Sequence, residues 1–401
     1  MISSVVVGML AACGAKPNTE TAKPGEPDRP AERMPGLDPR LIDSSVDPCT
    51  DFFRYACGNF SKLYPIPNDR SSFGTGAMLV DYTNHALHEI LEHSAQPRAD
   101  RTRAEQKIGD TYAACMDEAG INQRGLAPLQ PELDRIAALG SKAELPALVA
   151  HYQLIGVTAF FGFGEQQDFH DARNQIAAVL QGGLGLPERD YYLRTGTAAE
   201  TTRADYVQHI GKLLALTGIP AATATVDAQA IMALETALAK LSMDVTSQRD
   251  PKNVYHLMPV TALVELAPAF GWPKFLAASG APPITELNVA NPAFVRGLDA
   301  VIASTDLATI KSYLRWSVIA ATPGLALPRA LDAEKFDFGG RKLRGQPEQQ
   351  VRWKRCVAAT DNALGEALGE AYVAREFTPA SKAATLSGVA PYSAALRAAA
   401  S

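Results

Sequence analysis

Apolar residues recur at the three- and four-residue spacing of an α-helix through most of this chain, and this restricts it to largely helical folds. The clearest set is Ile108, Tyr112, Cys115 and Met116. Gly120 follows this set as the expected C-terminal cap, and Thr225 or Asp227 is the expected N-terminal cap of a second helix. The second helix has its apolar positions at Ile231, Leu234, Leu238 and Leu241. A third helix has them at Leu364, Leu368 and Tyr372.

Strand patterns with alternating apolar and polar residues are sparse in the sequence. The best candidate for a strand is the segment from Ile155 to Gly164. No internal repeat of solenoid length is present. We therefore predict a mainly α fold with minor β structure.

Composition and net charge exclude some classes of function. The chain has 401 residues, of which 47% are hydrophobic and 20% are charged, as in a globular protein with one to three domains. The formal net charge is −5, so the clustered positive charge of a nucleic-acid-binding protein is missing. No apolar run reaches the 18 or so residues that a membrane-spanning helix needs.

The N-terminus resembles the signal peptide of a bacterial lipoprotein. Leu10-Ala11-Ala12-Cys13 fits the pattern of an aliphatic residue, two small residues and the cysteine that takes the lipid, which makes Cys13 the expected lipid anchor. Residues 1–13 would then be signal peptide and lipobox, and residues 14–37 a flexible tether. The expected location is the bacterial cell envelope, lipid-anchored and facing the periplasm or in the outer membrane. Because the first residues lack Lys and Arg, a misassigned start with an ordinary cysteine is the alternative.

The histidines do not form a recognisable zinc motif. Two histidines four residues apart can reach one metal from the same helix face, but His88 and His93 are five apart and point about 140° away from each other. None of the seven histidines forms a pair four residues apart. The segment 85–93 is therefore predicted to be the polar face of an amphipathic helix, and a metal site on His85, His88 and a distant ligand is the alternative. We predict no catalytic residue and no metal ligand in this chain.

Several ordered stretches nevertheless resemble one family, the neprilysin-type zinc metallopeptidases. The resemblance covers approximately Asp38 to Lys382, and we assign residues 38–384 to the N-terminal domain of such a peptidase. The stretches that carry it lie at 47–60, 66–70, 112–117, 183–193, 253–255, 267–272, 343–346 and 352–357. Among them, Gly183-Leu184-Gly185-Leu186-Pro187 leads into Glu188-Arg189-Asp190-Tyr191-Tyr192-Leu193.

The resemblance implies a zinc-dependent endopeptidase of the cell envelope that hydrolyses oligopeptides. In that family the zinc lies on a helix with the motif H-E-x-x-H in the C-terminal region, where a glutamate acts as general base. This sequence has no such motif, so we expect the chain alone to be inactive and to hold no zinc. Residues 385–401 no longer resemble the family, and a frameshift, a premature stop or a natural truncation would each explain this ending.

The resemblance also assigns roles to the cysteines. It implies a disulfide between Cys115 and Cys356, whereas Cys49 and Cys57 match cysteines whose partners lie in the missing region. We expect these two to be left without those partners, unpaired, or free to mispair or to join each other. Four reduced thiols are the alternative. No substrate-binding residue is carried over, because Ser72 and Ala77 stand where some animal members have Arg and Asp.

Two kinds of partner follow from these predictions. The first is peptides or the missing C-terminal catalytic half, which would cover apolar faces of the segments 47–69 and 342–357. The second is the membrane, through the lipid anchor. A non-catalytic envelope lipoprotein that binds peptides or another protein is the rival function.

Overall fold

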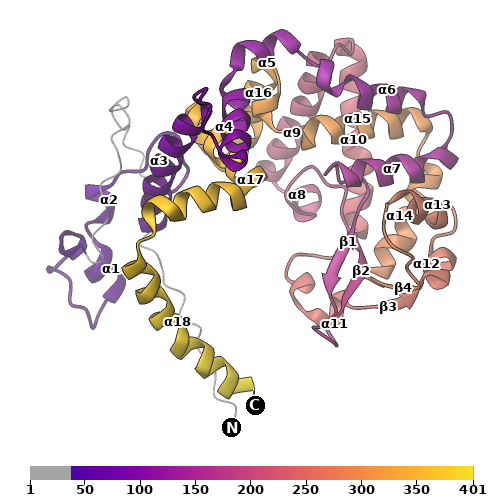
Figure 1. Cartoon of the computed structure of the whole chain (residues 1–401). Helices are drawn as coiled ribbons and strands as arrows, with labels where there is room; N and C mark the ends of the chain where they lie inside the picture. Colours follow the sequence, from indigo (N-terminus) through magenta and orange to yellow (C-terminus); the bar gives the residue numbers. More distant parts are fainter. Residues whose placement is uncertain (1–37, 401) are drawn as a thin grey trace. The chain divides into compact units, whose positions relative to one another are not determined.

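The computed structural model describes residues 38–400 and divides into two compact units. We call them the flanking unit, which comprises the residues up to Glu118 and those from Arg344 onward, and the central unit, Ala119–Leu343. Helices dominate both units, and the strands form one small sheet in the central unit (Figure 1). The prediction of a mainly α fold with minor β structure is confirmed. Among the described residues, no helix is both long and apolar enough to cross a membrane.

The flanking unit is built on three helices that pack against one another, α3, α4 and α17. Thr102 and Glu105 form a reciprocal capping box that fixes the start of α4. Non-helical backbone angles at Leu364 kink α17. The elements of this unit are η1 (Pro39–Leu41), α1 (Phe52–Cys57), α2 (Phe60–Leu63), α3 (Thr75–Ala95), α4 (Arg103–Met116), α17 (Arg352–Glu376) and α18 (Pro379–Ala400).

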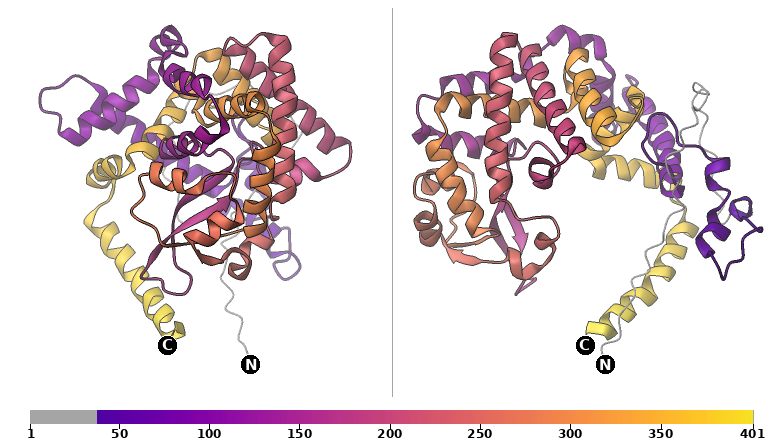
Figure 2. Two further views of the ribbon diagram at one scale, coloured as in Figure 1. Left: turned by 90° about the vertical axis from the view of Figure 1, so that its right-hand side faces the viewer. Right: turned by 180° about the vertical axis from the view of Figure 1, so that it is seen from behind.

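The central unit places its long helices around one hydrophobic core. Helices α9 and α10 lie side by side, joined by a short turn (Figure 2). The helices of this unit are α5 (Glu118–Arg124, which begins at the boundary), α6 (Gln130–Ala138), α7 (Leu145–Leu154), α8 (Asp190–Leu193), α9 (Thr197–Leu216), α10 (Ala221–Leu241), α11 (Pro251–Val254), α12 (Val260–Leu266), α13 (Trp272–Ala278), α14 (Pro292–Ser304), α15 (Leu307–Ala321) and α16 (Arg329–Phe336). Short turns of tighter or wider helix are η2 (Ala127–Leu129), η3 (Lys142–Glu144), η4 (Ser247–Arg249), η5 (Gly324–Ala326) and η6 (Asp337–Lys342).

The sheet has the strand order β1-β2-β4-β3, so β1 lies at one edge. Strands β1 and β2 form an antiparallel hairpin, β2 pairs in parallel with β4, and β3 pairs antiparallel with β4. Phe163 stands opposite Val179 in the hairpin, and Val179 stands opposite Val289 in the parallel pair. The strand bounds are β1 (Phe161–Gln167), β2 (Gln175–Gln181), β3 (Leu257–Pro259) and β4 (Glu286–Val289).

The structure corrects the predicted position of the strand. Strand β1 shares only residues 161–164 with the predicted segment, because Gly156 and Phe160 adopt positive φ angles of 81° and 65° and turn the chain before the strand begins. The positive φ at Phe160 is unusual for an aromatic residue, and it aligns the following residues with β2.

The helix caps also differ from the predicted ones. The helix over residues 108–116 is confirmed as α4, but Gly120 lies inside α5, and Gly125, with φ of 56°, follows the end of that helix. Thr225 and Asp227 lie inside α10, because the helix already begins at Ala221 after Pro220. Small alanines in the first turn start the helix well before the first large apolar residue that the pattern detects.

Candidate functional site

The histidine segment forms the predicted amphipathic helix. In α3, Leu87, Ile90 and Leu91 are buried, as the sequence predicts. His88 stacks on the indole of Trp353 with ring centroids 4.3 Å apart, and His85 lies 5.1 Å from the same ring. These histidines therefore contribute to packing between α3 and α17.

The described residues do not fit a zinc centre. Within residues 38–400, no group of three or more His, Cys, Asp or Glu side chains is placed to hold a metal ion. The alternative of a site on His85 and His88 therefore has no third ligand in this part of the chain.

The cysteines differ in whether they form a disulfide. Cys115 and Cys356 form the disulfide that the family resemblance implies, and it joins α4 to α17. Cys49 is exposed and free. Cys57 is itself disulfide-bonded whereas Cys49 is free, so the two do not join each other and Cys57 is not left unpaired. Cys13, the predicted lipid anchor, lies outside the described residues.

The stretch 183–193 surrounds a buried carboxylate that sequence reasoning missed. A Cβ atom added at Gly185 would lie 1.9 Å from the hydroxyl of Tyr206, so only glycine fits there. The hydroxyl of Tyr192 accepts hydrogen bonds from the backbone N–H groups of Gly185 (3.1 Å) and Leu186 (2.8 Å). The same hydroxyl donates to Oε2 of Glu235 at 2.6 Å. A signal in the sequence could have found Glu235, because it lies four residues after Ile231 and three before Leu238, on the apolar face of α10.

Glu235 is completely buried but fully hydrogen-bonded. Tyr206 donates to its Oε2 at 2.8 Å and Trp316 Nε1 donates to its Oε1 at 3.1 Å. Burial raises the pKa of Glu235 to about 7, although the hydroxyl and indole donors counteract this effect. The carboxylate borders a cavity of about 240 Å³, but both its oxygens already accept from donors of the protein, which indicates a structural role.

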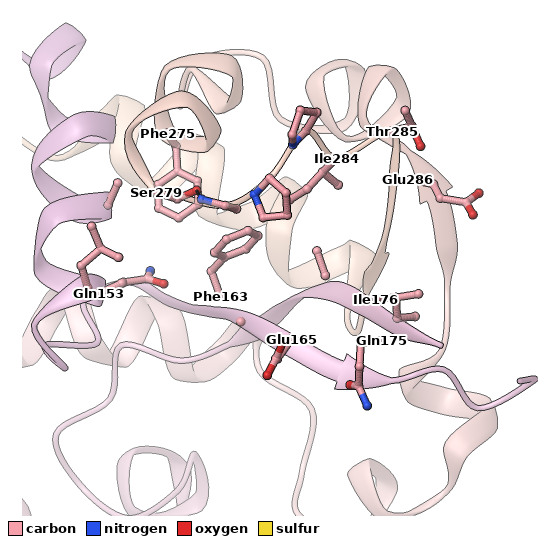
Figure 3. A pocket seen from close by; sticks show the side chains of 17 residues that line it. Gln153, Phe163, Glu165, Gln175, Ile176, Phe275, Ser279, Ile284, Thr285 and Glu286 are labelled. Carbon is pink, nitrogen blue, oxygen red and sulfur yellow. Dashed lines mark hydrogen bonds between the residues drawn. The ribbon is translucent and has the colours of Figure 1, made fainter. Parts of the chain in front are cut away.

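One candidate site is a groove on the sheet, which we call the strand groove. It has a volume of about 650 Å³ (Figure 3). Strands β1 and β2 form its floor, and the end of α7, the end of α13 and the segment before β4 form its walls. The residues that line it are Ala150, Gln153, Leu154, Phe163, Gly164, Glu165, Gln175, Ile176, Ala177, Phe275, Ser279, Ala281, Pro282, Pro283, Ile284, Thr285 and Glu286.

The strand groove combines an apolar centre with acidic residues. Phe163 packs edge-to-face on Phe275, with centroids 5.2 Å apart, and its ring points into the cavity (Figure 3). Glu165 and Glu286 are the charged residues of the lining, and no Lys or Arg is among them. Neither carboxylate has an ion-pair partner in the described part of the chain. This arrangement suits an apolar group flanked by positive charge.

Comparison with known proteins identifies relatives along most of the chain. The sequence profile for the N-terminal region of peptidase family M13 matches residues 48–396, and thus extends past residue 384, the domain end that the sequence resemblance predicts. Endothelin-converting enzyme 1 of Rattus norvegicus is 33% identical over 361 residues, which cover 85% of this chain and 46% of that protein.

Solved structures agree with this result. The zinc metalloprotease Zmp1 of Mycobacterium tuberculosis, solved with an inhibitor, superposes with a TM-score of 0.80 at 32% identity, covering 85% of this chain and 52% of that one. PepO from Lactobacillus rhamnosis shares the fold, with a TM-score of 0.71 at 19% identity, covering 82% of this chain and 52% of that one. The chain spans about half the length of these relatives. From the length of the profile match and the identity to endothelin-converting enzyme 1 and Zmp1, we conclude that this chain belongs to peptidase family M13, the neprilysin-type peptidases, and corresponds to their N-terminal region.

Proposed function

We propose that this chain supplies the N-terminal, mostly helical lobe of a zinc-dependent endopeptidase that hydrolyses oligopeptides. The observation that carries the proposal is the profile match over residues 48–396, supported by the similarity to a zinc metalloprotease over 85% of the chain. In this proposal the lobe limits access to a catalytic centre that is formed elsewhere.

We further propose that the chain alone does not hydrolyse peptides. Hydrolysis in this family needs two histidines one helical turn apart and a glutamate between them, and the 401 residues contain no such pair. The lining of the strand groove contains no histidine.

Exposed apolar side chains in the flanking unit support a covering partner. Phe52 and Phe53 of α1 are 68% and 52% exposed, and Val351 before α17 is 52% exposed. These residues lie in the segments 47–69 and 342–357, which the sequence predicts to face the catalytic region. Phe52 and Phe53 are neighbours in α1, and adjacent exposed apolar side chains are typical of surfaces that another protein covers.

A complementation assay tests the proposal. The purified chain is incubated with a quenched fluorescent oligopeptide, alone and with the separately produced C-terminal region of Zmp1. We expect no hydrolysis by either part and chelator-sensitive hydrolysis by the mixture. A mixture that stays inactive although the parts bind each other would contradict the proposal. Limited proteolysis provides a second readout, because the segment 47–69 should be cut in the isolated chain and protected in the mixture.

The second candidate is a non-catalytic envelope lipoprotein that binds peptides or a partner. The lipobox-like sequence at Leu10–Cys13 favours it, since anchoring at Cys13 would hold the chain at a membrane without any catalytic half. Expression of the full sequence in a bacterium with labelled palmitate tests the anchor. Labelling that disappears in Cys13→Ala supports it, and the absence of labelling in the unaltered protein would refute it.

A further inference from the structure

The backbone of β1 has an unused edge. Asp168 N–H donates to the carbonyl of Asn174 at 3.0 Å beside the hairpin turn, and in an antiparallel pair such bonded positions alternate with unbonded ones. By this alternation the backbone groups of residues 162, 164 and 166 face β2, whereas those of Phe163 and Glu165 face outward.

Two independent hydrogen bonds support this assignment. Gln153 Nε2 donates to the carbonyl of Phe161 at 3.0 Å from the outer side of β1. On the other side of the hairpin, Ala290 N–H donates to the carbonyl of Val179, the partner of Phe163, at 2.9 Å. Both bonds require that the odd-numbered residues of β1 and β2 point their backbone N–H and C=O groups away from the partner strand of the hairpin.

The outward groups are left available for an added strand. Within residues 38–400, no hydrogen bond engages the backbone N–H and C=O of Phe163 and Glu165 on this edge. Proteins commonly protect such edges with lysine, proline or a bulge, and Phe161–Gln167 has none of these. A Cβ added at Gly164 would meet no atom within 4 Å, so the face of the sheet is open at this position.

The strand groove provides side-chain recognition beside this edge. The ring of Phe163, which packs on the buried ring of Phe275, offers an apolar surface, while Glu165 adds a negative charge two residues further along β1. Figure 3 shows Gln153 at the end of the groove nearest to Phe163. Its amide holds the carbonyl of Phe161, so the free part of the edge begins at Phe163.

We propose that β1 binds an extended peptide that adds a strand to the sheet, with an apolar side chain opposite Phe163 and a Lys or Arg side chain opposite Glu165. An extended segment is the occupant that fits, because a helix has already used its own backbone donors and acceptors. The alternation of side chains along a strand then requires the apolar and the basic residue to be two positions apart. The proposal does not depend on the proposed function, because it needs neither zinc nor hydrolysis.

Peptide binding to the full 401-residue chain tests the proposal. The probe is fluorescein-labelled Thr-Thr-Leu-Thr-Lys-Thr-Thr, followed by fluorescence anisotropy. Two N-methylated versions are compared, one methylated on the Leu and Lys residues and the other on the Thr residues next to them. In strand addition only one of the two sets points its N–H groups at β1, so one version should bind about tenfold more weakly and the other should bind like the parent. Equal binding by both versions, or no saturable binding of the parent peptide, would overturn the proposal.

Charge provides a matched control. Glu165→Gln should weaken binding of the lysine peptide by about two- to fivefold, and a version with Glu in place of Lys should bind more weakly still. Glu265→Gln changes an exposed glutamate on α12 that does not line the groove, and it should leave binding unchanged. Equal effects of the two substitutions would rule out recognition at Glu165.

Discussion

Replacement of Glu235 by glutamine should remove a pH dependence from the stability of the central unit. The side chain keeps its size, and its remaining carbonyl oxygen still accepts hydrogen bonds from protein donors. Because the hydroxyl of Tyr192 already accepts from two backbone N–H groups, it cannot accept from the new amide. The amide carries two N–H donors where the protonated carboxyl carries one O–H, so the variant should leave one more buried donor unpaired. It should therefore be less stable than the wild type at low pH, by about 1–3 kcal/mol.

The magnitude of the pH effect follows from the pKa of Glu235. Burial raises this pKa from 4.5 to about 7, and at about 1.4 kcal/mol for each pKa unit this corresponds to about 3 kcal/mol. The protonated carboxyl is the form that the folded protein favours, so the stabilisation is complete below pH 4.5 and is lost as the pH rises through about 7. The wild type should lose its advantage over Glu235→Gln across this range.

Urea unfolding at several pH values between about 4.5 and 8 measures this difference. Tryptophan fluorescence is a suitable probe, since Trp316 donates directly to Glu235. Glu265→Gln is the control and should follow the wild type at every pH. A difference between wild type and Glu235→Gln that stays constant within about 0.5 kcal/mol would show that Glu235 titrates alike in the folded and unfolded states, and would refute the reasoning.

Two further predictions concern covalent and steric constraints. Cys356→Ala should lower the free energy of unfolding by about 2–5 kcal/mol, because the disulfide with Cys115 closes a loop of 241 residues. Equal urea midpoints for the oxidised and the reduced wild type would contradict this prediction. Gly185→Ala should lower the free energy of unfolding, measured by heat or urea, by about 2–4 kcal/mol, because its Cβ would overlap the Tyr206 hydroxyl. Gly369→Ala in α17 is the control: a Cβ there meets no atom within 4 Å, and the variant should be more stable by up to about 1 kcal/mol. Similar effects of both glycine variants would argue against close packing at Gly185.

The long helices could be predicted from the sequence, but the sheet could not. Large apolar residues at helical spacing identified α4, α10 and α17, because each helix buries one face. The β1–β2 hairpin gave only a weak strand pattern in the sequence, because Gly162 and Gly164 have no side chains that could alternate between the two faces. Strand β4 is only four residues long, which is too short to show such a pattern. The turn at Phe160 depends on a distant residue, since its backbone N–H donates to the hydroxyl of Tyr313, 153 positions away.

The candidate site was still less predictable. The groove forms where α7, α13 and the sheet meet, and these elements come from segments that lie far apart in the sequence. No short sequence pattern indicates that these distant segments pack against one another. The family resemblance, in contrast, anticipated the Cys115–Cys356 disulfide, because ordered short stretches carry information that periodicity lacks.

Metal analysis of the purified chain tests the central claim most directly. The protein is equilibrated with excess zinc, passed over a desalting column and analysed for bound metal, and the same sample is assayed on an oligopeptide. We predict far less than one zinc ion per chain and no hydrolysis. One retained zinc ion per chain, together with hydrolysis that a chelator abolishes, would contradict the account of a lobe without its own catalytic centre.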